Sequence, residues 1–100
     1  MDWIITNPPF CQAEAFIRHA AEIGVPFAFL LKSQYWHSAK RLNLYRKVQP
    51  TMVLPLTWRP DFTGQGNSLM DMCWNVWEPK YSGKIVTGYR PLEKPKGWEL

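Results

Sequence analysis

The stretch Asp2-Trp-Ile-Ile-Thr-Asn-Pro-Pro-Phe10 decides the predicted fold, because it joins a short apolar run to a stiff turn. The bulky residues 3–5 predict a strand that is covered on both faces. Pro8 ends strand pairing because it has no N–H, and a residue that precedes a proline favours extended backbone. We therefore expect the Asn7 amide and the Phe10 ring to be held in fixed directions at the carboxyl end of the strand, where open parallel sheets bind ligands.

This turn best suits a reaction at an amine that is attached to a planar group. The lone pair of an amine on a flat group is delocalised, so the nitrogen is a poor nucleophile. The side-chain oxygen of Asn7 and the carbonyl of Pro8 are two acceptors that can hold the amine hydrogens and favour the pyramidal form. Phe10 would stack on the flat group, as aromatic rings do for a base taken out of a duplex.

The motif Asn7-Pro8-Pro9-Phe10, between an apolar strand and a helix pattern, resembles the catalytic motif of class I S-adenosylmethionine-dependent amino-methyltransferases. The adenine-specific DNA methyltransferases are the largest group of that family. The resemblance covers most of residues 1–80, and the runs 58–62 and 70–77 are similar to phage and restriction-type members. It implies methyl transfer from S-adenosylmethionine to the exocyclic amine of adenine in DNA.

The resemblance also implies roles for single residues and a missing part. The catalytic residues would be Asn7, Pro8, Pro9 and Phe10, with Asn7 and Phe10 also beside the cofactor's methyl group. The family holds S-adenosylmethionine with a Gly-rich turn after its first strand and an acidic residue after its second, and neither motif occurs in this chain. We therefore expect the carboxyl half of the fold, which is inactive alone and needs a cofactor-binding half as a partner.

The next part of the chain predicts a helix and then a second strand. Residues 12–23 place apolar side chains at helical spacing, and Gly24 is a natural stop. These side chains are Ala13, Phe16, Ile17, Ala20 and Ile23. Residues 26–32 form a continuous apolar run that is too short for a helix, so we expect a buried strand parallel to the first.

Polar, aromatic and basic residues follow that strand and predict a nucleic-acid-binding surface. The carboxyl ends of parallel strands lie at the same end of the sheet. Lys32, Tyr35 and Trp36 should therefore lie beside the Asn-Pro-Pro-Phe turn. A second helix is expected over residues 38–48, with Ser38 as its N-cap and with Leu42, Tyr45 and Val48 facing inwards. Its basic residues would contact phosphates or form an ordinary solvated face. They are Lys40, Arg41, Arg46 and Lys47.

Two further strands complete the expected α/β fold. Residues 50–56 include Pro55, which indicates an edge position, and residues 69–77 alternate between two faces. We expect them to pair antiparallel, with the later strand inserted between the earlier strands and the edge. The fold class is then the carboxyl half of a Rossmann-like methyltransferase sheet: two parallel strands with a crossover helix plus an antiparallel pair.

The remaining segments carry weaker patterns. Residues 57–68 predict a flexible loop, and residues 84–89 predict a short strand. Residues 91–100 contain two prolines and a glycine and are expected to form a frayed tail. The predicted organisation is a catalytic region over residues 1–80, followed by a short strand and tail over 81–100.

Composition restricts the environment and the partners. The net charge of +4 favours a polyanionic partner, here DNA. No apolar run approaches the ~20 residues that span a bilayer, and no secretory signal pattern follows Met1. Two cysteines without metal-type spacing indicate reduced thiols, no metal site and a cytoplasmic location. The first strand would leave an open sheet edge, so a homo-oligomer is expected.

Two alternatives to DNA methylation stay open. Protein-glutamine and RNA amino-methyltransferases share the motif, because glutamine also presents a planar amide NH2. A non-catalytic nucleic-acid-binding remnant would also fit a chain without the cofactor half. The basic helix and the aromatic residues near the turn favour nucleic acid over protein.

Overall fold

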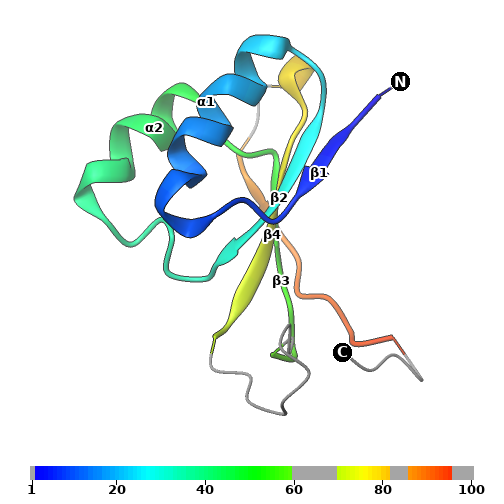
Figure 1. The fold of residues 1–100 in the computed structure, drawn as a ribbon. Helices are drawn as coiled ribbons and strands as arrows, with labels where there is room; N and C mark the ends of the chain where they lie inside the picture. Colours follow the sequence, from blue (N-terminus) through cyan, green and yellow to red (C-terminus); the bar gives the residue numbers. More distant parts are fainter. Residues whose placement is uncertain (1, 60–69, 82–85, 96–100) are drawn as a thin grey trace.

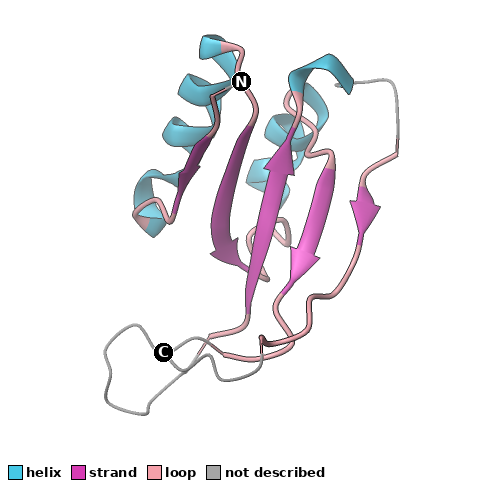
Figure 2. Ribbon diagram, turned by 90° about the vertical axis from the view of Figure 1, so that its right-hand side faces the viewer, coloured by secondary structure: helices cyan, strands magenta, loops and turns pink. Residues whose placement is uncertain are grey.

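The computed structural model describes residues 2–59, 70–81 and 86–95 as an α/β structure with one five-stranded mixed sheet. The helices lie on one face of that sheet (Figure 1), and the view onto the opposite face shows the strands in front of them (Figure 2). In chain order the elements are β1 (Ile4–Thr6), η1 (Phe10–Gln12), α1 (Ala13–Ile23), β2 (Phe27–Lys32), η2 (Ala39–Arg41), α2 (Leu42–Lys47), β3 (Met52–Pro55), β4 (Met72–Trp77), η3 (Pro79–Tyr81) and β5 (Gly88–Tyr89), where η denotes a 3₁₀ turn.

The β1-α1-β2 unit confirms the predicted strand, crossover helix and parallel strand. Ile4 pairs with Phe27 and Thr6 with Phe29 in the parallel register. Helix α1 ends at Gly24, whose left-handed backbone, with φ of 84°, lets its N–H bond the carbonyl of Ala20 at 3.3 Å. The carboxyl ends of β1 and β2 therefore lie at the same end of the sheet, as the sequence predicts.

Strand β4 is inserted between β2 and β3, and the sheet order is β1-β2-β4-β3-β5. It runs antiparallel to both neighbours, which confirms the predicted pairing and the predicted insertion. Pro55 does not mark the edge, because β5 pairs parallel with β3 on its far side. Pro55 is tolerated there because only its carbonyl is used, accepting the N–H of Leu92 at 2.8 Å.

Residues 88–92 are hydrogen-bonded to β3 and the residues next to it, so the predicted frayed tail does not begin at residue 91. Leu92 forms a parallel bridge with Leu56, and its carbonyl accepts the hydroxyl of Thr57 at 2.7 Å. Of the predicted strand over residues 84–89, the structure has Gly88–Tyr89, while residues 84 and 85 lie outside the described ranges. The predicted loop over 57–68 is described only up to residue 59, and the predicted tail only up to residue 95.

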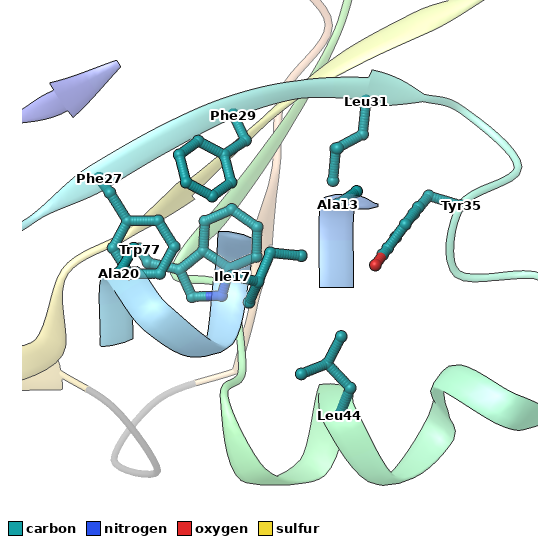
Figure 3. Packing of buried hydrophobic residues seen from close by; sticks show 9 residues of the cluster. All are labelled: Ala13, Ile17, Ala20, Phe27, Phe29, Leu31, Tyr35, Leu44 and Trp77. Atoms are coloured by element: carbon teal, nitrogen blue, oxygen red, sulfur yellow. The ribbon is translucent and has the colours of Figure 1, made fainter. Parts of the chain in front are cut away.

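The core lies between the sheet and the two helices (Figure 3). Phe27 and Trp77, on neighbouring strands, stack with ring centroids 4.6 Å apart and planes 11° apart. The cluster of buried residues consists of Ala13, Ile17, Ala20, Phe27, Phe29, Leu31, Tyr35, Leu44 and Trp77. Ala13, Ile17 and Ala20 confirm the predicted stripe, whereas Phe16 and Ile23 at its margins are exposed.

Two burial predictions are wrong. Strand β1 is not covered on both faces: Ile5 is 64% exposed and Trp3 is also exposed, because the helices cover one face only. In the second helix Leu42 is 47% exposed and Leu44 is the fully buried residue. The helix begins with the 3₁₀ turn η2, whose three residues per turn shift the phase of the apolar face.

Candidate functional site

The Asn-Pro-Pro-Phe turn links the carboxyl end of β1 to α1. Asn7 is exposed directly after the strand, and Pro8 is buried and anchors the turn. Pro9 has extended backbone, with φ of −54° and ψ of 132°, and its carbonyl accepts the N–H of Gln12 at 2.9 Å. Phe10 opens η1 with 48% of its surface exposed. An amide and an aromatic ring are thus both exposed on a turn whose backbone is hydrogen-bonded.

Two cations lie over the Phe10 ring. The Nζ of Lys32, the last residue of β2, is 4.1 Å from the ring centroid, and the guanidinium carbon of Arg41 is 5.8 Å away. Arg41 also lies 4.2 Å from the ring centroid of Tyr35 and donates from Nη1 to the Tyr35 carbonyl at 3.1 Å. We call Phe10, Lys32, Tyr35 and Arg41 the Phe10 cluster. The structure therefore brings together three predicted binding residues and the aromatic residue of the motif.

The Phe10 cluster has no carboxylate partner in the described part of the chain. The ion pairs there join Arg18 to Glu14, His19 to Glu22 and Arg59 to Asp71, and none reaches Lys32 or Arg41. Two cations beside an exposed ring make this end of the sheet electropositive. An anion that carries a flat group would find both partners it needs here.

Tyr35 and Trp36 form the inner wall of the site. Tyr35 is 1% exposed and Figure 3 shows its hydroxyl pointing into the core, where burial raises its pKa above the ordinary value. The indole N–H of Trp36 donates to Oδ1 of Asn75 at 2.8 Å, and its ring meets those of Tyr35 and Tyr45 edge to face. Tyr35 is therefore not on the predicted binding surface; it and Trp36 support the site from inside the fold.

The other predicted basic residues do not gather around Phe10. Lys40 and Arg46 are exposed on η2 and α2. Lys47, at the end of α2, lines a cavity of about 220 Å³ together with Phe27, Trp77 and Glu78. That cavity lies where β2 begins and β4 ends, at the opposite end of the sheet from Asn7. The basic residues of the second helix are therefore spread along it.

Sequence reasoning missed the buried amide of Asn75 and the contact of both cations with one ring. Asn75 is 1% exposed and also donates from Nδ2 to the Cys73 carbonyl at 3.4 Å. A polar residue on the inward face of the alternating strand, among Cys73 and Trp77, was the available signal. No sequence signal specifies that Lys32 and Arg41 both lie over Phe10, because that depends on how η2 packs.

No metal site is found among the residues that the structure describes, where no three His, Cys, Asp or Glu side chains form a group able to hold an ion. Cys11 is exposed, Cys73 is buried, and both are free thiols. Within the same ranges, no helix has the length and apolar character needed to cross a bilayer.

The turns after β1 and β2 do not fit the binding of S-adenosylmethionine, the cofactor that the sequence resemblance implies. The turn after β1 is Asn-Pro-Pro, and residues 33–37 after β2 are Ser-Gln-Tyr-Trp-His. Neither turn is Gly-rich, and the second has no carboxylate for a ribose hydroxyl. The described glycine with positive φ, Gly24, ends a helix and does not open one.

Comparisons with protein-family models, with curated proteins and with solved structures find no match to this chain.

Proposed function

We propose that this chain forms the acceptor side of an enzyme that transfers a methyl group from S-adenosylmethionine to the exocyclic amine of adenine in DNA. The observation that supports this most is the exposed pair Asn7 and Phe10 at the carboxyl end of β1, with Lys32 and Arg41 over the ring. The proposal requires a further segment or chain to bind the cofactor.

In this proposal some residues of the turn orient the target amine, and another stacks on the base that carries it. The Asn7 oxygen and the Pro8 carbonyl accept the two amine hydrogens and favour the form whose lone pair is free to attack. Positive charge grows on the nitrogen during attack, and the same two acceptors stabilise it. The amine becomes acidic only after attack, so no general base is needed beforehand. Phe10 stacks on the base and replaces part of the stacking lost on leaving the duplex.

The Phe10 cluster favours nucleic acid over a protein glutamine as substrate. A neutral glutamine side chain offers the two cations no negative charge, whereas each nucleotide has a phosphate near its base. Lys32 and Arg41 have no carboxylate partner in the described ranges, and the whole chain carries a net charge of +4. Release of counterions from DNA would add to the affinity of such a surface.

The sheet order supports the resemblance to the amino-methyltransferases. In that family the last two strands close the sheet, with the later one inserted between the earlier strands and its partner. The first four strands of the order β1-β2-β4-β3-β5 follow the same rule, with the Asn-Pro-Pro-Phe motif directly after β1, whereas β5 outside β3 departs from it. The chain would then correspond to the carboxyl half of a Rossmann-like methyltransferase sheet.

A non-catalytic nucleic-acid-binding module is the second candidate, and the lack of a cofactor turn among the described residues favours it. Single-turnover transfer from S-adenosylmethionine with a labelled methyl group to an adenine-containing duplex separates the two. The chain is assayed alone and together with the products of the neighbouring reading frames. Label in N6-methyladenine that disappears with Asn7→Ala supports the enzyme. Salt-sensitive DNA binding without label in any combination supports the binding module.

A further inference from the structure

We propose that Lys32 determines the substrate class of this site, because its ammonium occupies the Phe10 ring until a phosphate draws it away. A flat base would then stack on Phe10 more strongly when it brings a phosphate with it. The inference rests on the proposed function, since it concerns the ring that would hold the base.

The geometry makes the base and the ammonium competitors for the same space. The Nζ of Lys32 lies 4.1 Å from the centroid of Phe10. A base stacked on the same face of that ring would have its own centroid about 4.5–7 Å away, so it would overlap the ammonium. The backbone of Lys32 is fixed by pairing with Met72, but its four-carbon side chain can rotate away.

The contacts around Lys32 determine what can draw it away. No carboxylate in the described ranges bonds it, so leaving the ring gains nothing within the protein. Arg41 is held on Tyr35 by its bond to the Tyr35 carbonyl and its stacking on that ring, and therefore has less freedom to move. A phosphate beside an entering base would give the ammonium a charge-assisted partner. Neutral planar amides and nucleosides offer no such exchange.

The first test follows the Lys32 side chain by nuclear magnetic resonance in the whole chain. An ammonium over a ring places its neighbouring CH2 protons in the ring current, so the Lys32 Hε signals should be shifted upfield in the free protein. Phe10→Leu should remove that shift. Titration with deoxyadenosine 5′-monophosphate should move the signals to ordinary values, and deoxyadenosine at equal concentration should not. Lys94, exposed after β5 at the opposite edge of the sheet from β1, is the internal control.

The second test compares the two ligands on substituted proteins. The parent should prefer the monophosphate over deoxyadenosine by roughly tenfold or more. Lys32→Ala should strengthen deoxyadenosine binding roughly two- to fivefold, because the ring is uncovered, and should weaken binding of the monophosphate. Lys94→Ala, which removes the same charge after β5 at the opposite edge of the sheet from β1, should leave deoxyadenosine binding unchanged. Circular dichroism checks that each variant is folded.

Several outcomes would overturn the inference. Equal weakening of both ligands by Lys32→Ala would make Lys32 an ordinary contact, and an unchanged ratio would make it a bystander. If neither ligand shifts the Phe10 ring signals in any variant, the ring is not a stacking surface. If the ligand ratios are as expected but Asn7→Ala methylates as fast as the parent, the proposed function alone is wrong. If methylation depends on Asn7 but Lys32→Ala leaves the ligand ratio unchanged, this inference alone is wrong.

Discussion

The indole N–H of Trp36 donates a 2.8 Å hydrogen bond to Oδ1 of Asn75, thirty-nine positions later in the chain. This bond ties the segment after β2 to the middle of β4. Asn75 is the buried polar residue among the described ones, so its amide depends on such partners. The position of Tyr35, next to Trp36, depends on the same bond.

Removing one partner of this bond should therefore destabilise the fold. Trp36→Phe leaves the Asn75 oxygen buried without its donor, and we expect a loss of about 1–3 kcal/mol in the free energy of unfolding. Urea titration measures it. Asn75→Leu in the Trp36→Phe background removes the orphaned amide and should recover part of the loss. A double variant that loses as much as the sum of the single ones would show that the bond contributes no coupling.

Tyr35→Phe is expected to stabilise the protein. The Tyr35 hydroxyl is buried without a hydrogen-bond partner in the described part of the structure, and such a group costs about 1–3 kcal/mol. The ring and its stacking on Arg41 remain in the variant. Thermal and urea unfolding of both proteins give the difference. Tyr45→Phe is the matched control, because the Tyr45 hydroxyl bonds Thr87 at 2.7 Å and its loss should destabilise.

The same tyrosine should make stability fall in alkaline solution. Burial raises the Tyr35 pKa above its ordinary value of 10.0, so above that pH the unfolded chain releases a proton that the folded chain retains. This proton release favours the unfolded state, so the free energy of unfolding falls as pH rises past 10. The parent should lose more stability there than Tyr35→Phe. Equal pH profiles for the two proteins would contradict a raised pKa.

In the assembled enzyme, Asn7→Ala should lower the single-turnover methylation rate by ~10²–10³ while leaving the fold intact. The fold survives because Asn7 is exposed and its side chain is not part of the core. The rate falls because the variant lacks one of the two acceptors of the amine hydrogens. Phe10→Ala should weaken binding of the flipped base by about 1–3 kcal/mol, and Phe10→Tyr should be tolerated. Base-exposure fluorescence separates binding from chemistry. Near-parental rates in Asn7→Ala would reduce the motif to a structural turn.

DNA binding should depend on salt through Lys40 and Arg41, at the start of the second helical segment. Replacing Lys40 and Arg41 with glutamine should reduce the slope of log affinity against log salt by about 1.8, if each residue neutralises one phosphate. Arg46 and Lys47 carry the same charge along the helix, with Lys47 at the far end of the sheet. Their glutamine variants are the control and should leave most of the slope. Equal effects of the two pairs would indicate that the whole helix contacts DNA.

The open edge of β1 should promote self-association. Strand β1 pairs with β2 on one side, and no other described strand pairs with it. Its exposed Ile5 and Trp3 flank backbone groups that a second copy could bond. Light scattering should detect dimers or larger species, and Ile5→Lys should reduce them. Ile23→Lys, at an exposed isoleucine that ends α1, should not. Monomers at high concentration would contradict the prediction.

Local patterns predicted the elements well because local physics determines them. Gly24 ends α1 through its left-handed backbone, and the alternation along β4 reappears as Cys73, Asn75 and Trp77 facing the helices. The convergence of Lys32 with Phe10 was also predictable, since the carboxyl ends of parallel strands meet.

What failed depended on packing between distant segments. The sequence of β1 is apolar enough for a strand covered on both faces, yet whether a second layer exists is not encoded in five residues. Leu44 replaces Leu42 in the core because the helix starts as a 3₁₀ turn, a choice made by its contacts and not by periodicity. Pro55 was placed at an edge because the two-residue strand β5 carries almost no pattern of its own.

The insertion of β4 also has a consequence for the order in which the chain can fold. Strand β1, helix α1 and strand β2 can assemble from consecutive residues, but β3 reaches the sheet only through β4, which is synthesised after it. A nascent chain that stops before residue 72 would hold β3 without a neighbour for its ladder. Because such non-local pairing is slow, we expect folding to be limited by the arrival of β4, and a chaperone or a ribosome stall would act most strongly in that interval.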